Sequence, residues 1–264
     1  MSARPTAIVA LAENPANSGL ILDFDGVLSP IVEDPTTSAM PDQVATILSR
    51  LAPRLGLLAV ISGRPAEFLA DRVPVAGVRL LGSYGMEQIR DGVRRIDPDA
   101  EEWLGPVREA SRTLGDSLAG WPGIRVEEKS VSVAVHWRQA PDHAAAATEV
   151  RRVTTRIAAE TGLRLEPGKL VEELRPPVDV DKGSAISALI ATEKLSTIAY
   201  AGDDLGDIPA LDAVHDSPGA EGYALVVDHG SETDPRLLER ADQIFAGTEG
   251  FAAWLAELAA AIGA

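Results

Sequence analysis

Short apolar runs recur along the chain, and each ends at glycine or at acidic residues. Five stand out: GLILDFD (19–25), LGLLAVISGR (55–64), VRLLGSYG (78–85), STIAYAGDD (196–204) and GYALVVDHG (222–230). Stretches with apolar residues at helical spacing, 42–55 and 181–194, separate several of them. Strands that are apolar on both faces and alternate with helices predict a Rossmann-like α/β fold, a parallel sheet covered on both sides. Ligands of such folds bind beyond the carboxyl ends of the strands.

The middle of the chain has a different pattern. Helical spacing predicts helices over Ala100–Leu118 and His143–Thr161. In SVSVAVHWR (130–138) apolar and other residues alternate, which is typical of a half-buried antiparallel strand. The Pro-Gly pair in EPGKL predicts a hairpin between Leu163–Glu166 and Leu170–Arg175.

These elements, two helices and about four antiparallel strands, predict an α+β domain inserted into the parallel-sheet domain. We place the inserted domain at residues 99–178 and the parallel-sheet core at 1–98 and 179–264. The two crossings, near Asp97–Pro98 and Pro176–Pro177, predict a hinge that closes the inserted domain over the site.

Composition narrows the class of protein. The 264 residues are 45% hydrophobic and 24% charged, as in an ordinary globular protein with a packed core. The formal net charge of -16 argues against a nucleic acid or an anionic membrane as the main partner. The absence of cysteine excludes disulfides and thiolate metal sites and favours a cytoplasmic protein. The four histidines lack zinc-site spacing, so each is expected to be structural or on the surface.

Acidic residues follow two of the apolar runs. Asp23 and Asp25 end the first run, and Asp203 and Asp204 follow the fourth, with Asp207 close behind. Either cluster alone has an ordinary explanation, since acids and glycine are common in turns and at helix starts. Two clusters after core strands are harder to explain in this way, because crowded carboxylates repel one another unless a cation lies among them. Oxygen ligands of this kind suit Mg²⁺.

Two further strand ends or helix starts carry groups that bind anions. Ser62, Gly63 and Arg64 end the second run and supply a hydroxyl, a flexible backbone and a guanidinium suited to phosphate oxygens. Lys182 lies at the start of a predicted helix for which Asp181 is a candidate N-cap. The ammonium group of Lys182 and the N-terminus of this helix can then bind the same anion.

The order of these motifs, DxD, S-G, K-G and GDD, resembles the haloacid dehalogenase superfamily of phosphotransferases, whose core this chain would share. The resemblance implies that Asp23 attacks phosphorus and that Asp25 acts as general acid and then general base. It implies that Ser62 binds a phosphate oxygen and that Lys182 neutralises the phosphate and the nucleophile.

By the same resemblance, Mg²⁺ is held by Asp23, by the backbone carbonyl of Asp25 and by Asp203, and Asp204 and Asp207 support the site. The inserted domain corresponds to the cap that selects substrates in this superfamily. The presence of the second aspartate favours hydrolysis of phosphate esters over cleavage of carbon–halogen or carbon–phosphorus bonds.

More specific segments resemble the trehalose-6-phosphate phosphatase family. They are DFDGVLSPI, VISGRP, LLGSYGMEQ, VEEKSVSVAVHWR, GKLVEELRP followed by DKG, and YAGDDLGD. The resemblance implies an enzyme that hydrolyses trehalose 6-phosphate. It implies that the sugar is bound by Glu127 and Lys129 at a hairpin tip and by Arg138 and Glu173.

Periodicity agrees with these roles only in part. Arg138 falls on the polar face of the predicted strand, but Lys129 would fall on the apolar face of one straight strand. We therefore predict a turn at Glu127–Ser130. Glu172 is an alternative to Glu173 as the sugar-binding residue, and the spacing to Arg175-Pro176 favours Glu173.

Two positions depart from the family pattern: Tyr84 replaces a usual histidine and Gly206 replaces a usual threonine. Alternative substrates are sucrose phosphate, mannosyl-phosphoglycerate or a trehalose-like pseudosugar phosphate, and a sugar-phosphate mutase is less favoured. A protein of another class, a non-catalytic sugar-phosphate-binding partner of a synthase, is disfavoured by the presence of Asp23, Asp25, Lys182 and Asp203. We expect a monomer with a functional link to a trehalose-phosphate synthase.

Overall fold

The computed structural model describes residues 4–32, 34–168 and 170–264, and the chain forms two compact units. The first, here called the core unit, consists of the chain up to Arg95 together with Val180–Ala264. The second, the inserted unit, is Ile96–Asp179. Among the described residues, no helix combines the length and apolar composition needed to cross a membrane.

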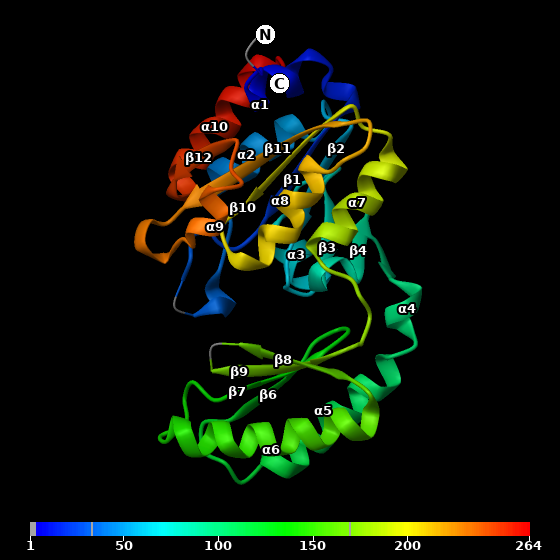
Figure 1. Cartoon of the computed structure of the whole chain (residues 1–264), viewed down its shortest axis with the longest axis vertical. Helices are drawn as coiled ribbons and strands as arrows, with labels where there is room; N and C mark the ends of the chain where they lie inside the picture. The colour runs from blue at the N-terminus through cyan, green and yellow to red at the C-terminus, as the bar shows by residue number, and fades with distance from the viewer. Residues whose placement is uncertain (1–3, 33, 169) are drawn as a thin grey trace. The chain divides into compact units, whose positions relative to one another are not determined.

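The core unit is built on an eight-stranded sheet (Figure 1). In spatial order its strands are β12 (Gln243–Ala246), β11 (Glu221–Asp228), β10 (Thr197–Gly202), β1 (Ser18–Asp23), β2 (Leu57–Ile61), β3 (Arg79–Gly82), β4 (Glu87–Arg90) and β5 (Val93–Ile96). The strands from β12 to β3 are parallel and β4 is antiparallel to β3. The predicted parallel α/β fold is confirmed. The β4–β5 hairpin was not predicted, although its turn, Asp91-Gly92 with φ of 52° and 75°, is a strong hairpin signal.

Both faces of this sheet are covered by helices, as the apolar runs predict. One layer contains α1 (Ala7–Glu13), α2 (Asp42–Leu51), α3 (Ala66–Arg72) and α10 (Gly247–Ala261), and the other contains α7 (Lys182–Glu193), α8 (Ile208–His215) and α9 (Pro235–Leu238). Alternate residues of β1 enter the two cores: Leu20 and Leu22 pack into the first and Ile21 into the second. Each such buried side chain contributes about 1.5–3 kcal/mol relative to an exposed one.

Strand register brings the predicted site residues to one edge of the sheet. Asp23, the last residue of β1, pairs with Ile61 of β2, so Ser62 follows directly beside it. On the other side Leu22 pairs with Ala201 of β10, and Asp203 follows one residue after that strand ends. Parallel pairing thus gathers residues far apart in sequence at the carboxyl edge.

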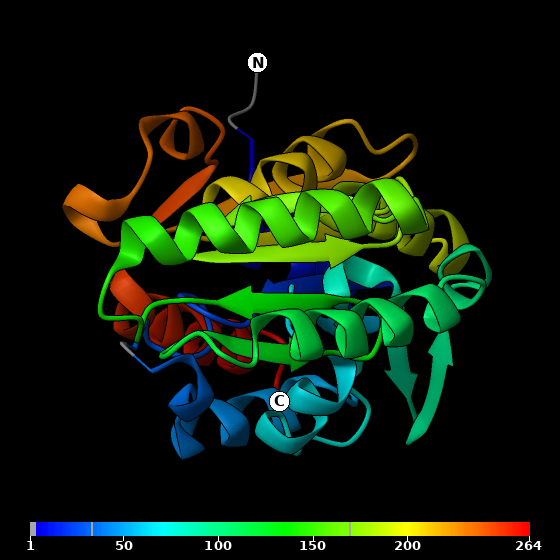
Figure 2. The same cartoon turned by 90° about the horizontal axis from the view of Figure 1, so that it is seen from below.

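The inserted unit contains a separate, antiparallel sheet with helices on one face (Figure 2). Its order is β6 (Arg125–Glu128), β7 (Val133–His136), β9 (Val171–Arg175) and β8 (Arg164–Gly168). Helices α5 (Leu104–Leu118) and α6 (His143–Thr161) bury their apolar stripes against it. The β8–β9 hairpin forms as predicted, and Lys169 lies outside the described residues.

The prediction of one helix over Ala100–Leu118 is wrong. The chain forms a short helix, α4 (Pro98–Glu101), and then α5 from Leu104. Pro106 explains the break, because it lacks the N–H that would donate to the carbonyl of residue 102 and its ring would clash with that carbonyl. In the first turn of α5 the same proline is tolerated, since N–H groups there have no partner within the helix.

The turn predicted at Glu127–Ser130 forms later in the chain, between Lys129 and Ser132. Strand β6 continues through Glu128, and the Lys129 N–H donates to the Ser132 carbonyl at 2.9 Å. Glu127 therefore lies within a strand, opposite Ala134, while Lys129 begins the turn. Strand β7 ends at His136, and Arg138 is exposed in the turn that follows.

Candidate active site

Asp23 and Lys182 form a buried ion pair at the carboxyl edge of the core sheet. The Lys182 Nζ lies 2.9 Å from Asp23 Oδ2 and 2.6 Å from Asp207 Oδ1, and all three side chains are less than a tenth exposed. Lys182 is the first residue of α7, whose start is fixed by the predicted N-cap Asp181 and by Ser184 in a reciprocal capping box. The cap thus sets where the ammonium enters the site.

Asp207 is the anchor of this cluster. Its Oδ1 accepts hydrogen bonds from Lys182 and from the Tyr200 hydroxyl, and its Oδ2 accepts from the backbone N–H groups of Asp203 and Asp204. A carboxylate offers about four acceptor positions, so this one is fully used. Asp207 therefore supports its neighbours and has no acceptor position left for a further ligand.

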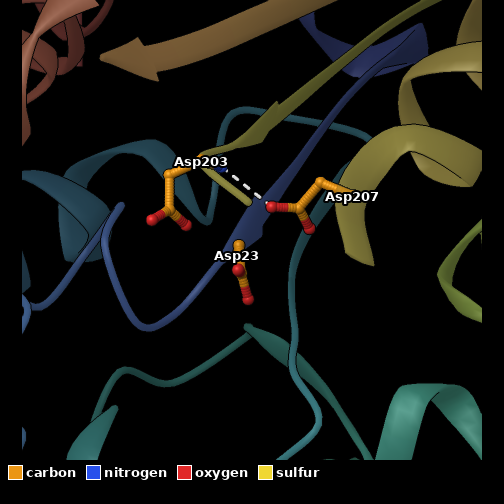
Figure 3. Close-up of side chains that lie close together, drawn as sticks. All are labelled: Asp23, Asp203 and Asp207. Atoms are coloured by element: carbon orange, nitrogen blue, oxygen red, sulfur yellow. Dashed lines mark hydrogen bonds between the residues drawn. The ribbon is translucent and has the colours of Figure 1, made fainter. Parts of the chain in front are cut away.

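Asp203 provides the clearest evidence for a cation site. Oxygens of Asp23, Asp203 and Asp207 lie within 4.8 Å of one another (Figure 3). Within the described part of the chain, the Asp203 carboxylate accepts no hydrogen bond, and a His229 nitrogen lies 3.6 Å away. Burial and the charges of Asp207 and Asp204 raise the pKa of Asp203 to about 8. A buried carboxylate that ionises this reluctantly fits a position where a divalent cation would bind.

The pKa of Asp23, the candidate nucleophile, is shifted by the same cluster of neighbouring charges. Burial raises the pKa of Asp23 well above its usual range, Lys182 opposes this shift, and Asp207 and Asp203 add to it. Burial alone would lower the pKa of Lys182, but the negative charges of Asp207 and Asp23 outweigh it and raise that pKa. Lys182 is thus held as a cation, and a second positive charge beside Asp23 would favour its ionised form.

Asp25, two residues on, is held by different groups. The Arg64 Nε donates to its Oδ2 at 2.9 Å, and Arg64 Nη2 and the Ser38 hydroxyl donate to its Oδ1 at 3.1 and 2.7 Å. Ser62 is buried, and its Oγ accepts from the Arg64 N–H at 3.2 Å. Direct binding of phosphate by Arg64 stays a prediction, because the Nε and Nη2 of its guanidinium donate to Asp25.

Two residues with contacts at this edge were missed in the sequence. His229, expected to be structural or on the surface, follows β11 and contacts the Gly26 carbonyl through Nε2 at 2.9 Å. Gly26 has φ of 76°, and a Cβ there would lie 2.0 Å from Asp203 Oδ2. Ser38 gave no signal because a lone serine after a Pro-Thr-Thr segment is common in loops. Only the fold brings it to Asp25.

Tyr84, one of the two departures from the family pattern, packs on the loop that carries Ser62. A Cβ on Gly63 would lie 2.7 Å from the Tyr84 ring, and the Tyr84 N–H donates to the Ser62 carbonyl at 2.9 Å. Ser83 and Tyr84 both have left-handed backbone conformations, with φ of 50° and 62°. Such strain persists only where surrounding contacts enforce it. Gly206, the other departure, donates its N–H to Asp204 Oδ1 at 2.8 Å.

The open face of the inserted sheet carries most of the predicted sugar-binding residues. Strand pairing aligns Glu127, Ala134 and Glu173 in one row across this face. The Lys129 Nζ lies 3.0 Å from Glu173 Oε2, and Ser132 also donates to Glu173. Arg138, in the turn beyond β7, is not brought to this row by any contact among the described residues.

Glu127 and Glu172 have different hydrogen-bond partners and different surroundings. A hydrogen bond with His136, at 2.7 Å, lowers the pKa of Glu127 to about 2 despite partial burial, with help from Arg125. Glu172 points to the other face, where it is buried and accepts from Thr154 Oγ1 at 2.6 Å and Arg151 Nε at 3.1 Å. Of the two adjacent glutamates, only Glu173 lies on the open face.

The sequence was compared with known proteins. Residues 21–239 match the trehalose-phosphatase family. The chain belongs to this family. A trehalose-phosphate phosphatase of Mycobacterium avium is 35% identical over 221 residues, covering 81% of this chain and 56% of the relative. The chain thus spans a little over half the length of that relative.

Solved structures agree on the fold. A trehalose-6-phosphate phosphatase related protein superposes with a TM-score of 0.77 at 23% identity, covering 92% of this chain and 97% of the other. A haloacid dehalogenase-like hydrolase from Bacteroides thetaiotaomicron superposes with a TM-score of 0.62 at 17% identity, covering 91% and 99%. The chain therefore has the haloacid dehalogenase-like fold expected from its motifs.

Proposed function

We propose that this chain is a Mg²⁺-dependent phosphatase that hydrolyses trehalose 6-phosphate to trehalose and phosphate. The observation that carries the proposal is the buried Asp23–Lys182 pair beside a cluster of carboxylates at the carboxyl edge of the sheet. Membership of the trehalose-phosphatase family and the Mycobacterium avium relative support the choice of sugar.

The chemistry would proceed in two steps. An Asp23 carboxylate oxygen attacks phosphorus, the bond from phosphorus to the sugar oxygen breaks, and Asp25 gives its proton to the leaving alkoxide. Asp25, now ionised, takes a proton from a water molecule that attacks the aspartyl-phosphate, which releases phosphate and restores the Asp23 carboxylate. Lys182 neutralises the charge that gathers between Asp23 and the phosphoryl oxygens, and Ser62 donates to one of those oxygens.

Asp23, Asp203 and the backbone carbonyl of Asp25 would hold the magnesium ion. Bound there, the cation would keep Asp23 ionised and screen its repulsion from the incoming phosphate. The raised pKa of Asp203 and of Asp23 supports this assignment. Asp204 and Asp207 would support the site, and the four hydrogen bonds accepted by Asp207 fit that role.

The inserted unit would act as the cap that selects the sugar. Glu127, Lys129 and Glu173, on its open face or the adjoining turn, supply charged groups suited to sugar hydroxyls, and Arg138 would join them. Closure about the crossings near residues 97–98 and 176–177 would exclude water before phosphoryl transfer. We further propose a cytoplasmic monomer with a functional link to a synthase that makes its substrate.

A phosphate-release panel tests the proposal. Purified protein with Mg²⁺ should release phosphate from trehalose 6-phosphate faster than from sucrose 6-phosphate or glucose 6-phosphate. Asp23→Asn keeps the shape of the side chain and should lower turnover by about a thousandfold or more, because the nucleophile is lost. Asp42→Asn, at an exposed helix start, is the matched control. Preference for another sugar phosphate would refute the substrate, and equal turnover by Asp23→Asn would refute the mechanism.

A further inference from the structure

A two-serine hydrogen-bond chain leads to Asp25. The Ser38 hydroxyl lies 2.7 Å from Asp25 Oδ1, and its oxygen lies 2.7 Å from the Ser29 hydroxyl. Both serines are fully buried, although Asp25 itself is about a third exposed. Ser29 is also tied to the catalytic loop by its carbonyl, which accepts the Gly26 N–H at 2.8 Å.

The hydrogen bonds in this chain have a preferred direction. An ionised carboxylate only accepts, so Ser38 must donate its single proton to Asp25. The Ser38 oxygen is then an acceptor toward Ser29, which donates to it. Ser29 has one alternative acceptor, the Pro30 carbonyl, at the longer distance of 3.3 Å. The preferred order of donation is therefore Ser29 to Ser38 to Asp25.

This chain also determines which Asp25 oxygen stays available. Among the residues that the structure describes, Oδ1 accepts from both Ser38 and Arg64 Nη2, while Oδ2 accepts from Arg64 Nε alone. With about two acceptor positions on each oxygen, the remaining one belongs to Oδ2. Oδ2 is thus the oxygen able to carry the proton that a leaving alkoxide receives.

We propose that Ser38, oriented by Ser29, is a positioning residue that holds Asp25 so that Oδ2 exchanges the proton during phosphoryl transfer. This inference rests on the proposed function, since it assigns the orientation of the general acid in that reaction. Arg64 donates one hydrogen bond to each oxygen and so does not distinguish them. Ser38 adds a donor to one oxygen and removes the equivalence of the two.

The first test compares Ser38→Ala with Thr37→Ala. Thr37 precedes Ser38 and is exposed, and within the described parts of the chain its hydroxyl donates only to the Asp34 carbonyl. With trehalose 6-phosphate, Ser38→Ala should lower kcat/KM and kcat by about tenfold, part of the total that general acid catalysis supplies, with KM within about twofold. Thr37→Ala should match wild type. Equal kcat for Ser38→Ala and wild type would overturn the inference.

A substrate with a good leaving group separates positioning from structural damage. The value of kcat/KM reports steps up to the departure of the leaving group, and p-nitrophenolate departs without needing a proton. Ser38→Ala should therefore lower kcat/KM for p-nitrophenyl phosphate by less than about twofold. A loss equal to that on the sugar phosphate would mean that Ser38 acts on the whole site and not through Asp25, and would overturn the inference.

The double variant Ser29→Ala/Ser38→Ala guards against misfolding. Ser38→Ala leaves the Ser29 hydroxyl buried beside an apolar group, whereas removing both partners of a hydrogen bond can be nearly neutral for stability. The double variant should melt like wild type and keep the tenfold loss of kcat. Recovery of kcat together with stability would overturn the inference. If wild type releases no phosphate from any sugar phosphate, the proposed function fails and this result is distinct from those above.

Discussion

Asp207 shows how a single buried side chain holds several neighbouring groups in place. It is fully buried and accepts from Lys182, Tyr200 and two backbone N–H groups. Its four acceptor positions are used within the chain, so its charge serves to place the ammonium and the loop that carries Asp203. Its removal leaves Lys182 with one carboxylate partner.

We therefore expect Asp207→Ala to lower the free energy of unfolding by about 3–5 kcal/mol, as when one partner of a buried ion pair is deleted. Urea unfolding measures this value. The control is Asp212→Ala, whose half-exposed carboxylate pairs with Arg240 at 2.8 Å and should cost less than about 1 kcal/mol. Similar losses in the two variants would contradict the anchoring role.

Asp203 predicts how stability depends on pH and metal. Its pKa in the folded, metal-free protein is about 8, above the ordinary 3.8, so the folded state binds this proton more tightly than the unfolded chain. The resulting stabilisation is complete at low pH and is lost as pH rises from about 4 toward 8. A cation that binds the ionised carboxylate should oppose the loss.

Thermal unfolding with EDTA or with Mg²⁺ measures this effect. The increase in Tm caused by Mg²⁺ should be several degrees larger at pH 8 than at pH 5, since about 1 kcal/mol shifts Tm by 2–4 °C in a protein of this size. Asp203→Asn should abolish most of the difference. An increase that is independent of pH, or unchanged in the variant, would argue against Asp203 as a ligand.

At the scale of the element, strand β9 places two adjacent glutamates on opposite faces of the inserted sheet. Glu172 binds Thr154 and Arg151 of α6, while Glu173 binds Lys129 and Ser132 on the open face. The alternation of a strand therefore assigns different roles to neighbours of the same type.

Glu173→Gln should raise KM for trehalose 6-phosphate by about tenfold, the value of a hydrogen bond to a charged group, and leave unfolding nearly unchanged. Glu172→Gln should instead lower the free energy of unfolding by about 1–3 kcal/mol and leave KM within about twofold. Steady-state kinetics and urea unfolding of both variants provide the measurements. The opposite assignment of the two effects would exclude Glu173 from sugar binding.

Element boundaries were the weaker part of the sequence prediction, for identifiable reasons. Apolar periodicity extended one helix across Ala100–Leu118 because it takes no account of Pro106, which ends the preceding helix. The turn after β6 was placed too early because residue alternation fixes the face of a strand but not the point where pairing stops. The Asp91-Gly92 hairpin could have been predicted from its dipeptide.

For the molecule as a whole, the proposed hinge closure between the two units can be tested by energy transfer. The chain has no cysteine, so cysteines introduced at exposed Asp116 and Glu257 would carry a dye pair, one in each unit. We expect energy transfer to change when Mg²⁺ and trehalose 6-phosphate are added to the Asp23→Asn variant, which cannot turn over. A pair at Glu239 and Glu257, both in the core unit, should not respond. No change in the first pair would contradict hinge closure.

The amino-acid pattern was sufficient to predict the parallel α/β fold, the inserted α+β segment and the polar residues that end the strands. These follow from local periodicity and from residue type, both of which can be read along one chain. Asp23 and Asp203 could be proposed together because parallel strands necessarily present their carboxyl ends at one edge, and Lys182 was added as the start of a helix.

Which of these groups are in contact depends on the packing of the folded chain. In the folded chain Asp207 accepts hydrogen bonds from Lys182 and Tyr200. Asp25 accepts from Arg64 and Ser38. His229 lies beside the Gly26 carbonyl. Such contacts join residues up to 203 positions apart, as in the last of these pairs. These contacts cannot be predicted from a local pattern, because a hydrogen bond forms only within a few tenths of an ångström of its best length. The packing of the whole sheet sets that length.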